Sequence, residues 1–242
     1  MSIKIGHASI DENGKIVGGN IGDQTGKEIC IRNWYSKPWN VYLECTDPVI
    51  ADKATSFMEQ ICADPNYGYD QSQRITGYNS IKANGGKVVG AKGEFDCSSL
   101  VSTCYRLAGL NISPSSTTRS IRANFMATGK FKLYMDAAHL TSDKYAKRGG
   151  IYLKEGSHVV MALEDGTGDK NPYKEPMLTI RLGSKSEGVK WVQWALNQDG
   201  FKIDIDGSCG PITDQVIREY QRKHSLVVDG KVGTKTRQSM RR

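Results

Sequence analysis

Apolar residues recur at helical spacing in the segment that follows residue 93. They occupy positions i, i+1, i+4, i+7 and i+8, which lie on one face of a helix. These positions are Leu100, Val101, Cys104, Leu107 and Ala108. Asp96 precedes the pattern at the position of a helix cap, and Gly109 ends it. The pattern therefore predicts a helix that begins near Cys97.

Two short apolar runs further along the chain predict strands, one over residues 151–153 and one over residues 159–163. In an alternating strand, His158, Val160 and Ala162 share one face. His158 opens the second strand, so we expect its imidazole at a strand end, outside a sealed core.

Helical periodicity returns after residue 177. Residues 165–176 are rich in glycine, proline and charge, which indicates a domain boundary. Beyond it, apolar residues at spacings of three and four predict two amphipathic helices, one around Val189–Leu196 and one around Val216–Tyr220. We expect a first domain over 1–168, a linker over 169–177 and a second domain over 178–242.

An internal repeat lies in this C-terminal part. Residues 206–213 and 229–236 both read DGxxGxxT, with a period of 23 residues. Glycines at fixed offsets allow turns with positive φ, and threonine is a suitable N-cap for the helix that follows. Each repeat is expected to form a turn that leads into a helix.

Composition narrows the class of protein. Hydrophobic residues make up 38% of the 242 residues and charged residues 24%, which excludes disordered, collagen-like and disulfide-scaffold chains. The sequence shows no apolar stretch behind a basic start and no window of 18 apolar residues, so we expect no signal peptide and no membrane span. Six cysteines without a CxxC pair and four scattered histidines predict free thiols, no metal site and no cofactor.

The net charge of +7 is concentrated at the C-terminal end. From Met177 onward there are 12 Lys and Arg against 7 Asp and Glu. A basic domain attracts polyanions, so charge alone is compatible with a nucleic acid, with an anionic cell wall or with an ordinary solvated face.

Cys97 and His158 are the candidate catalytic pair. At a helix N-terminus, backbone N–H groups and the helix dipole favour a thiolate, so we expect a lowered pKa for Cys97. A thiolate nucleophile needs a base, which His158 supplies. Cys104 lies on the apolar face of the same helix and is expected in the core.

A third group is needed to orient the imidazole. If residues 165 and 166 form a two-residue hairpin, the partner of His158 lies near residue 173. Asn171 is then the closest orienting group.

The residues around this pair resemble a known family. FDCSSLV at 95–101 resembles the DCSxL signature of the NlpC family of papain-like cell-wall peptidases. KRGGIYLKEGSHVVMAL at 147–163 resembles the strand pair of that family, with Gly150 in place of the usual Asp. The resemblance covers roughly residues 56–166 and implies an α+β, papain-like catalytic domain. The family often has a polar residue downstream of its histidine, which again points near Asn171.

Two further segments extend the resemblance to phage lysins. GYDQSQR at 68–74 matches a stretch that lysins of this group tend to carry, which implies that Tyr69, Asp70 and Gln71 line the cleft. A Tyr or Gln there could donate to the oxyanion, and one such donor is worth about 3 kcal/mol of barrier. Without the resemblance, the segment is equally well explained as a turn with an exposed arginine.

Residues 1–50 resemble an N-terminal extension of clostridial phage lysins. Its aromatic cluster, Trp34, Tyr35 and Trp39, is suited either to sugar stacking or to packing.

Residues 178–240, with their duplicated DGxxGxxT motif, resemble the peptidoglycan-binding domain of three-helix type. That family usually has an aromatic or aliphatic residue where Cys209 stands, and we expect Cys209 to be a small buried hydrophobe. The implied fold is an α+β catalytic domain followed by a small all-α domain.

Together these resemblances imply a bacteriophage endolysin that cleaves an amide bond of the peptidoglycan stem. The reaction is that of a γ-D-glutamyl-diamino-acid endopeptidase or an N-acetylmuramoyl-L-alanine amidase. The expected partner is peptidoglycan, with anionic wall polymers as a second candidate, and we expect no nucleic acid and no membrane. The expected location is the host cytoplasm before lysis and then the wall. The alternatives are a non-catalytic wall-binding protein with a degenerate peptidase fold, and a cytoplasmic thiol acyltransferase or nucleic-acid binder, which would leave the duplicated motif unexplained.

Overall fold

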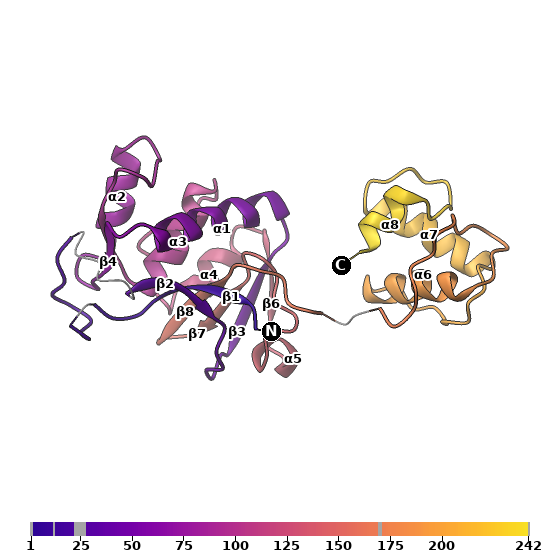
Figure 1. Cartoon of the computed structure of the whole chain (residues 1–242), viewed down its shortest axis with the longest axis horizontal. Coiled ribbons are helices and arrows are strands. Elements are labelled where there is room, and N and C mark those ends of the chain that lie inside the picture. Colours follow the sequence, from indigo (N-terminus) through magenta and orange to yellow (C-terminus); the bar gives the residue numbers. More distant parts are fainter. Residues whose placement is uncertain (1, 12, 22–27, 169–170, 242) are drawn as a thin grey trace. The chain divides into compact units, whose positions relative to one another are not determined.

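The computed structural model describes residues 2–11, 13–21, 28–168 and 171–241. The chain divides into two compact units, Met1–Gly168 and Asp169–Arg242, each considered by itself (Figure 1). Of the expected linker, residues 169–170 lie outside the described residues. Tyr173 packs on the core of the second unit, and Glu175 forms an ion pair with Arg241. In the described part of the chain, no helix is long and apolar enough to cross a membrane.

A six-stranded antiparallel sheet forms the centre of the first unit. Its order is β2-β1-β8-β7-β3-β6. The strands are β1 (Lys4–Ala8), β2 (Ile29–Asn33), β3 (Val41–Cys45), β6 (Phe131–Tyr134), β7 (Ile151–Lys154) and β8 (His158–Ala162). The first fifty residues therefore supply three strands of the central sheet, and they are not an extension outside it.

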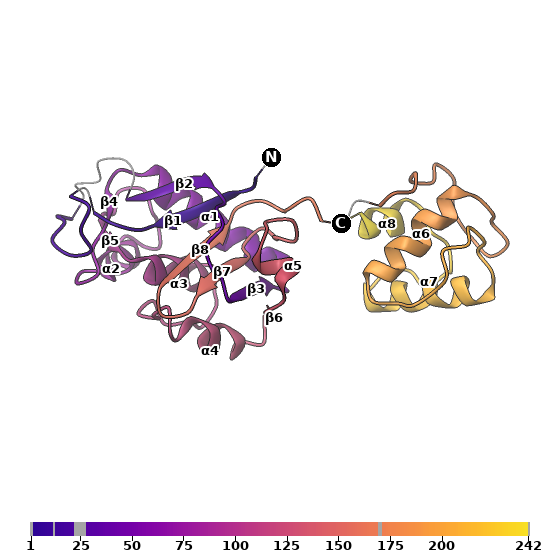
Figure 2. The ribbon, with the colours of Figure 1, turned by 90° about the horizontal axis from the view of Figure 1, so that it is seen from below.

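The longer helices cover one face of this sheet, and the short helix at residues 137–140 packs on the other face beside Tyr42. The two main ones are α1 (Pro48–Ala63) and α3 (Cys97–Leu107), which lie side by side above the strands (Figures 1 and 2). The remaining elements of this unit are β4 (Tyr67–Tyr69), α2 (Thr76–Ala83), β5 (Gly93–Phe95), α4 (Ile121–Met126) and α5 (Ala137–Leu140). β4 and β5 pair in parallel as a separate two-stranded sheet.

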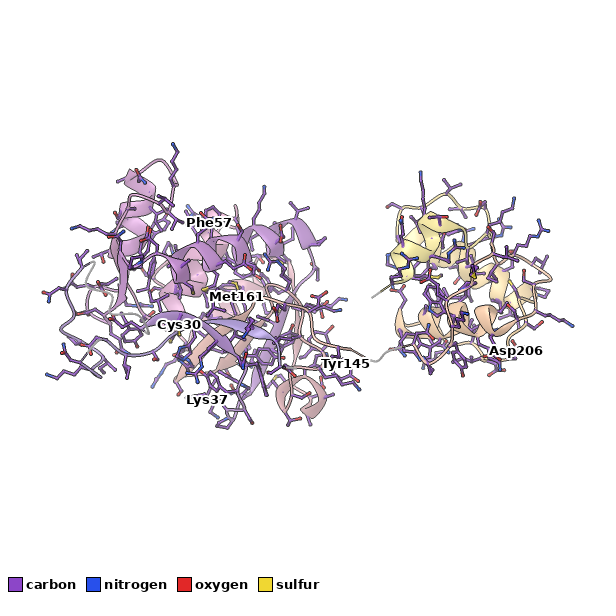
Figure 3. The ribbon with its side chains drawn as sticks, viewed as in Figure 1. Cys30, Lys37, Phe57, Tyr145, Met161 and Asp206 are labelled. Atoms are coloured by element: carbon purple, nitrogen blue, oxygen red, sulfur yellow. The ribbon has the colours of Figure 1, made fainter. Side chains whose placement is uncertain are left out.

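Alternation along β8 divides the core of the first unit in two. Val159 and Met161 face α1 and α3 and belong to the larger apolar cluster. Val160 and Ala162 face the other way, into a second cluster that contains Trp39. Phe57 of α1 and Lys37 mark these two sides of the sheet in Figure 3. The predicted strand and its faces are confirmed.

The helix predicted after residue 93 is also confirmed. The Asp96 side chain accepts a hydrogen bond from the Ser99 backbone N–H, and the Ser99 hydroxyl accepts one from the Asp96 backbone N–H, which together form a capping box. At the other end Gly109 has φ of 104°, a conformation that glycine adopts at little cost. Cys104 is fully buried in the core, as expected.

The second unit contains α6 (Glu187–Gln198), α7 (Pro211–Lys223) and α8 (Thr234–Met240) around an apolar core. Cys209 is fully buried in this core, as its assignment as a small hydrophobe predicts. The predicted threonine caps are wrong, because α7 and α8 begin after the glycines at 210 and 233. All six cysteines of the chain are free thiols.

Candidate functional site

Cys97 is the first residue of α3 and lies against β8. The backbone N–H groups of Ser98 and Val159 lie close enough to its sulfur to lower the pKa of the thiol. Val159 follows His158 directly, so Cys97 at the tip of α3 lies near the start of the strand that His158 opens. Only 7% of Cys97 and 8% of His158 are exposed.

The expected lowering of the Cys97 pKa is wrong in direction. Burial raises the pKa of this thiol to about 12, and the neighbouring Asp96 carboxylate adds to the effect. The Val159 and Ser98 N–H groups and the Arg74 charge act in the opposite direction but do not compensate. Desolvation of a thiolate therefore outweighs the favourable groups at the helix N-terminus, and Cys97 is a neutral thiol at pH 7.

His158 opens β8 as predicted, but its ring is enclosed. Trp39 stacks on the imidazole with ring centroids 6.2 Å apart. Its Nε2 atom is buried without a hydrogen-bond partner in the described part of the chain. Burial lowers the pKa of His158 to about 3, assisted by the nearby His7, Lys37 and Arg32. The imidazole is therefore neutral at pH 7 and able to accept a proton.

His7 is a site residue that the sequence analysis left without a role. Ile5 of β1 pairs with Ala162 of β8, so His7 lies level with Val160, on the face that His158 shares. The rings of His7 and His158 meet edge to face with centroids 5.0 Å apart. Burial lowers the pKa of His7 to about 4, with contributions from Arg32 and Lys37.

The only sequence signal for His7 is its position in the strand-like pattern of residues 3–8. That signal was not usable, because nothing in the sequence indicated that β1 would pair with a strand more than 150 positions away.

Two tyrosines lie within the electrostatic reach of Cys97. Burial raises the pKa of Tyr69 and of Tyr35 to about 12, and the nearness of Cys97 contributes to both shifts. Gln71 Nε2 donates to the Tyr69 hydroxyl at 3.1 Å. Tyr69 and Gln71 are thus joined to each other and close to the thiol.

Asp70, which was also expected to line the cleft, has structural contacts instead. It is fully buried, and its carboxylate accepts hydrogen bonds from the backbone N–H groups of Gly18, Ser72 and Gln73. Burial raises the pKa of Asp70, but these bonds and the Ser72 hydroxyl outweigh it and the net shift is downward. The side chain holds the loop after β4 against the segment near residue 18.

Arg74 ends the same segment and supports the cap of α3. Its Nε lies 2.6 Å from Asp96 Oδ2, and its Nη2 donates to the Ser98 hydroxyl at 2.9 Å. The arginine is therefore not the exposed residue of a simple turn. It connects the 68–74 segment to the first residues of α3, on either side of Cys97.

Asn171 lies in the second unit. Its Nδ2 donates to the Trp191 carbonyl at 2.9 Å, and its Oδ1 accepts from the Tyr173 backbone N–H. The hairpin that pointed to this residue does not form, because β8 pairs with β7 and β1 and residues 163–168 form no strand. The neighbouring strand that carries a polar group toward His158 is β1, with His7.

Gly150, the departure from the usual Asp of the NlpC pattern, has a packing explanation. A Cβ at this position would clash with the Tyr42 hydroxyl, which accepts a hydrogen bond from the Lys147 backbone N–H. No side chain fits without displacing this tyrosine. Among the described residues, no group of three His, Cys, Asp or Glu side chains is placed to hold a metal ion.

Comparison with protein families covers most of the chain. Residues 5–169, more than half of the chain, match the model described as Endolysin-like domain. The chain belongs to the endolysin-like domain family. From Ile5 of β1 onward, the match spans the strands and helices of the first unit, including His7. Residues 185–240 match the model described as Putative peptidoglycan binding domain. Both domains connect the chain with the bacterial cell wall.

Solved structures with sequence similarity match short parts of the chain. The Burkholderia AP3 phage endolysin is 34% identical over 26% of this chain and 25% of its own, with a TM-score of 0.26. The SleB N-terminal domain is 34% identical over 28% of this chain and 93% of its own, with a TM-score of 0.27. A fused Zn-dependent amidase/peptidase/peptidoglycan-binding protein from Clostridium acetobutylicum is 37% identical over 27% of this chain and 29% of its own, with a TM-score of 0.27. The match thus spans about a quarter of the phage endolysin. Comparison with curated proteins gives no match.

Proposed function

We propose that the endolysin-like domain hydrolyses an amide bond of the peptidoglycan stem with Cys97 as nucleophile, and that the second unit binds the same polymer. One observation carries the proposal. Cys97 at the start of α3 lies near the backbone of Val159, the residue after His158, and both Cys97 and His158 are buried. A cysteine at a helix start with a neutral imidazole beside it is the arrangement that acyl transfer to a thiol requires.

The reaction begins from a neutral pair, because the pKa of Cys97 is raised and that of His158 is lowered. His158 takes the thiol proton as the sulfur attacks the amide carbon, and then gives this proton to the leaving amine. Water, deprotonated by the same imidazole, then attacks the thioester, which releases the acid and restores the thiol. The scissile bond belongs to an endopeptidase or an amidase substrate, and both reactions use these groups.

The groups around the pair have supporting roles in this proposal. Tyr69, linked to Gln71, is the candidate donor to the oxyanion, and one such donor is worth about 3 kcal/mol of barrier. His7 is the candidate orienting group for His158, because the two rings are in contact.

The test compares wild type, Cys97→Ala and Cys45→Ala on purified Gram-positive cell walls. Cys45 is a half-buried free thiol of β3 and serves as the matched control. We expect wild type and Cys45→Ala to clear the walls, with new amino termini that identify the bond, and Cys97→Ala only to bind them. Equal clearing by Cys97→Ala contradicts the nucleophile. Binding without clearing by all three favours the non-catalytic wall-binding protein.

A further inference from the structure

Two open pockets in the second unit lie on the two copies of the DGxxGxxT repeat. One, of about 640 Å³, lies against residues 206–213, and the other, of about 520 Å³, lies against residues 229–236. Asp206, at the edge of the unit in Figure 3, lines the first. Lining residues of the two pockets correspond at the 23-residue offset of the repeat, as in Ile203 and Leu226, Asp206 and Asp229, and Thr213 and Thr236.

The polar network beside each pocket is built in the same way. Gln193 Nε2 donates to Asp206 Oδ1 at 2.7 Å, and Gln221 Nε2 donates to Asp229 Oδ1 at 3.0 Å. Each amide also donates to the carbonyl two residues after that aspartate and to the threonine of its own repeat. Each amide oxygen accepts from the glycine N–H of its DG pair. Both glutamines are buried, so the duplication preserves a rigid site and not only a turn.

Exposed apolar side chains complete both pockets. Ile212 lines the first and is 72% exposed, and Val227 lines the second and is 74% exposed. Phe201 adds an aromatic ring to the first. A concave site with apolar walls and a few fixed polar groups, at these volumes, is typical of a small-ligand pocket.

The charges of the two pockets differ. Lys235 of the second repeat stands where Ile212 stands in the first, and Lys231 stands where Ser208 does. Both lysines are exposed and line the second pocket, where they outnumber its one carboxylate, that of Asp229, so this pocket is basic. The first pocket has one lysine, Lys202, and the carboxylates of Asp204 and Asp206. An anionic group is favoured in the second pocket only.

We propose that the second unit holds peptidoglycan through two pockets at once, one in each repeat. The pocket of residues 229–236 takes a carboxylate of a stem peptide, and the pocket of residues 206–213 takes an uncharged sugar ring against Phe201 and Ile212. The inference rests on peptidoglycan being the ligand, as proposed above. A repetitive polymer presents both groups together, so occupation of one pocket makes binding at the other intramolecular and increases retention on the wall.

The buried glutamines supply direct reporters for a test. The full chain carrying Cys97→Ala is titrated with a soluble disaccharide–tetrapeptide fragment, and the side-chain amide NMR signals of Gln193 and Gln221 are followed. Both signals are expected to shift. A fragment with amidated carboxyl groups is expected to shift Gln193 alone. Lys235→Glu is expected to remove the Gln221 shift, and Arg222→Glu, the same charge change outside both pockets, to retain it.

The outcomes separate this inference from the proposed function. A shift of only one glutamine with the free-acid fragment, or equal shifts of Gln221 with the acid and the amide, overturns the two-pocket assignment. If neither glutamine shifts but the chain is still retained on purified walls, the pockets are wrong and the wall-binding role stands. If the chain is not retained on walls either, the wall-binding half of the proposed function fails with them.

Discussion

The imidazole rings of His7 and His158 meet edge to face, with ring centroids 5.0 Å apart. They lie on adjacent antiparallel strands, the first and the last of the first unit in chain order. Both rings are buried and both have lowered pKa values, so at neutral pH the pair is uncharged. His158 also stacks on Trp39, which leaves the imidazole held between an indole and a second imidazole. The candidate base is therefore fixed by residues of the first fifty positions.

Replacement of His7 tests whether its ring nitrogens orient His158. His7→Phe keeps an aromatic ring against His158 but has no polar atom. We expect kcat on cell walls to fall, by less than the roughly 100-fold or more that follows loss of a general base, with KM unchanged. Because His7 also contributes to the low pKa of His158, the acid limb of the pH–rate profile should move to higher pH. Wild-type kcat and profile in His7→Phe would show that the contact is only packing.

The buried histidines also predict how stability depends on pH. Their folded pKa values, about 4 for His7 and about 3 for His158, lie below the value of about 6.5 in the unfolded chain. Between these limits the unfolded state binds more protons, so the free energy of unfolding decreases as pH falls from 6.5. Urea midpoints at pH 7, 6 and 5 should decrease in that order. His7→Phe should flatten the trend, and an unchanged slope in this variant would contradict the assigned pKa of His7.

Alkylation of Cys97 tests the direction of its pKa shift. Because the pKa is raised to about 12, the thiolate fraction and the rate of modification by iodoacetamide should rise about tenfold per pH unit from pH 7 to 9. The measurement is mass spectrometry of the peptide that contains Cys97. Cys104, fully buried in the same helix, is the internal control and should stay unmodified. A rate that is constant above pH 7 would indicate the lowered pKa that the helix N-terminus alone predicts.

The ion pair between Arg74 and Asp96 is expected to stabilise the start of α3. Asp96→Ala removes both the cap and the ion pair and should destabilise the protein by about 1–2 kcal/mol. Arg74→Ala removes the ion pair, the bond to Ser98 and the bonds to the carbonyls of Ser115 and Ser116, but leaves the cap in place. In a double-mutant cycle measured by urea unfolding, the two effects should be less than additive, because the groups interact directly. Strict additivity would mean that the contact contributes nothing to stability.

Local patterns were sufficient for several elements of this protein. The spacing of apolar residues around Cys97, the aspartate before it and the glycine after it specify a capped helix through contacts within a few residues. Alternation in β8 likewise identified which side chains share the face of His158, because side-chain direction along a strand follows from its pleat. The repeat at a 23-residue offset indicated a duplicated structure in the second unit.

Features that depend on distant segments needed the tertiary structure. The pairing of β1 with β8 brings His7 to His158, and no local pattern specifies which strand becomes the neighbour of another. The pKa of Cys97 follows from the helix N-terminus only if the thiol is solvated, and its enclosure between α3 and β8 reverses the sign. In the second unit the repeat motif predicted the threonines as caps, whereas Thr213 and Thr236 are the third residues of their helices and accept hydrogen bonds from Gln193 and Gln221. The sequence by itself determined the helix that carries Cys97 and the strand that carries His158. Burial and strand order depend on contacts between distant segments, so only the tertiary structure decided the charge states of these two residues and brought His7 to His158.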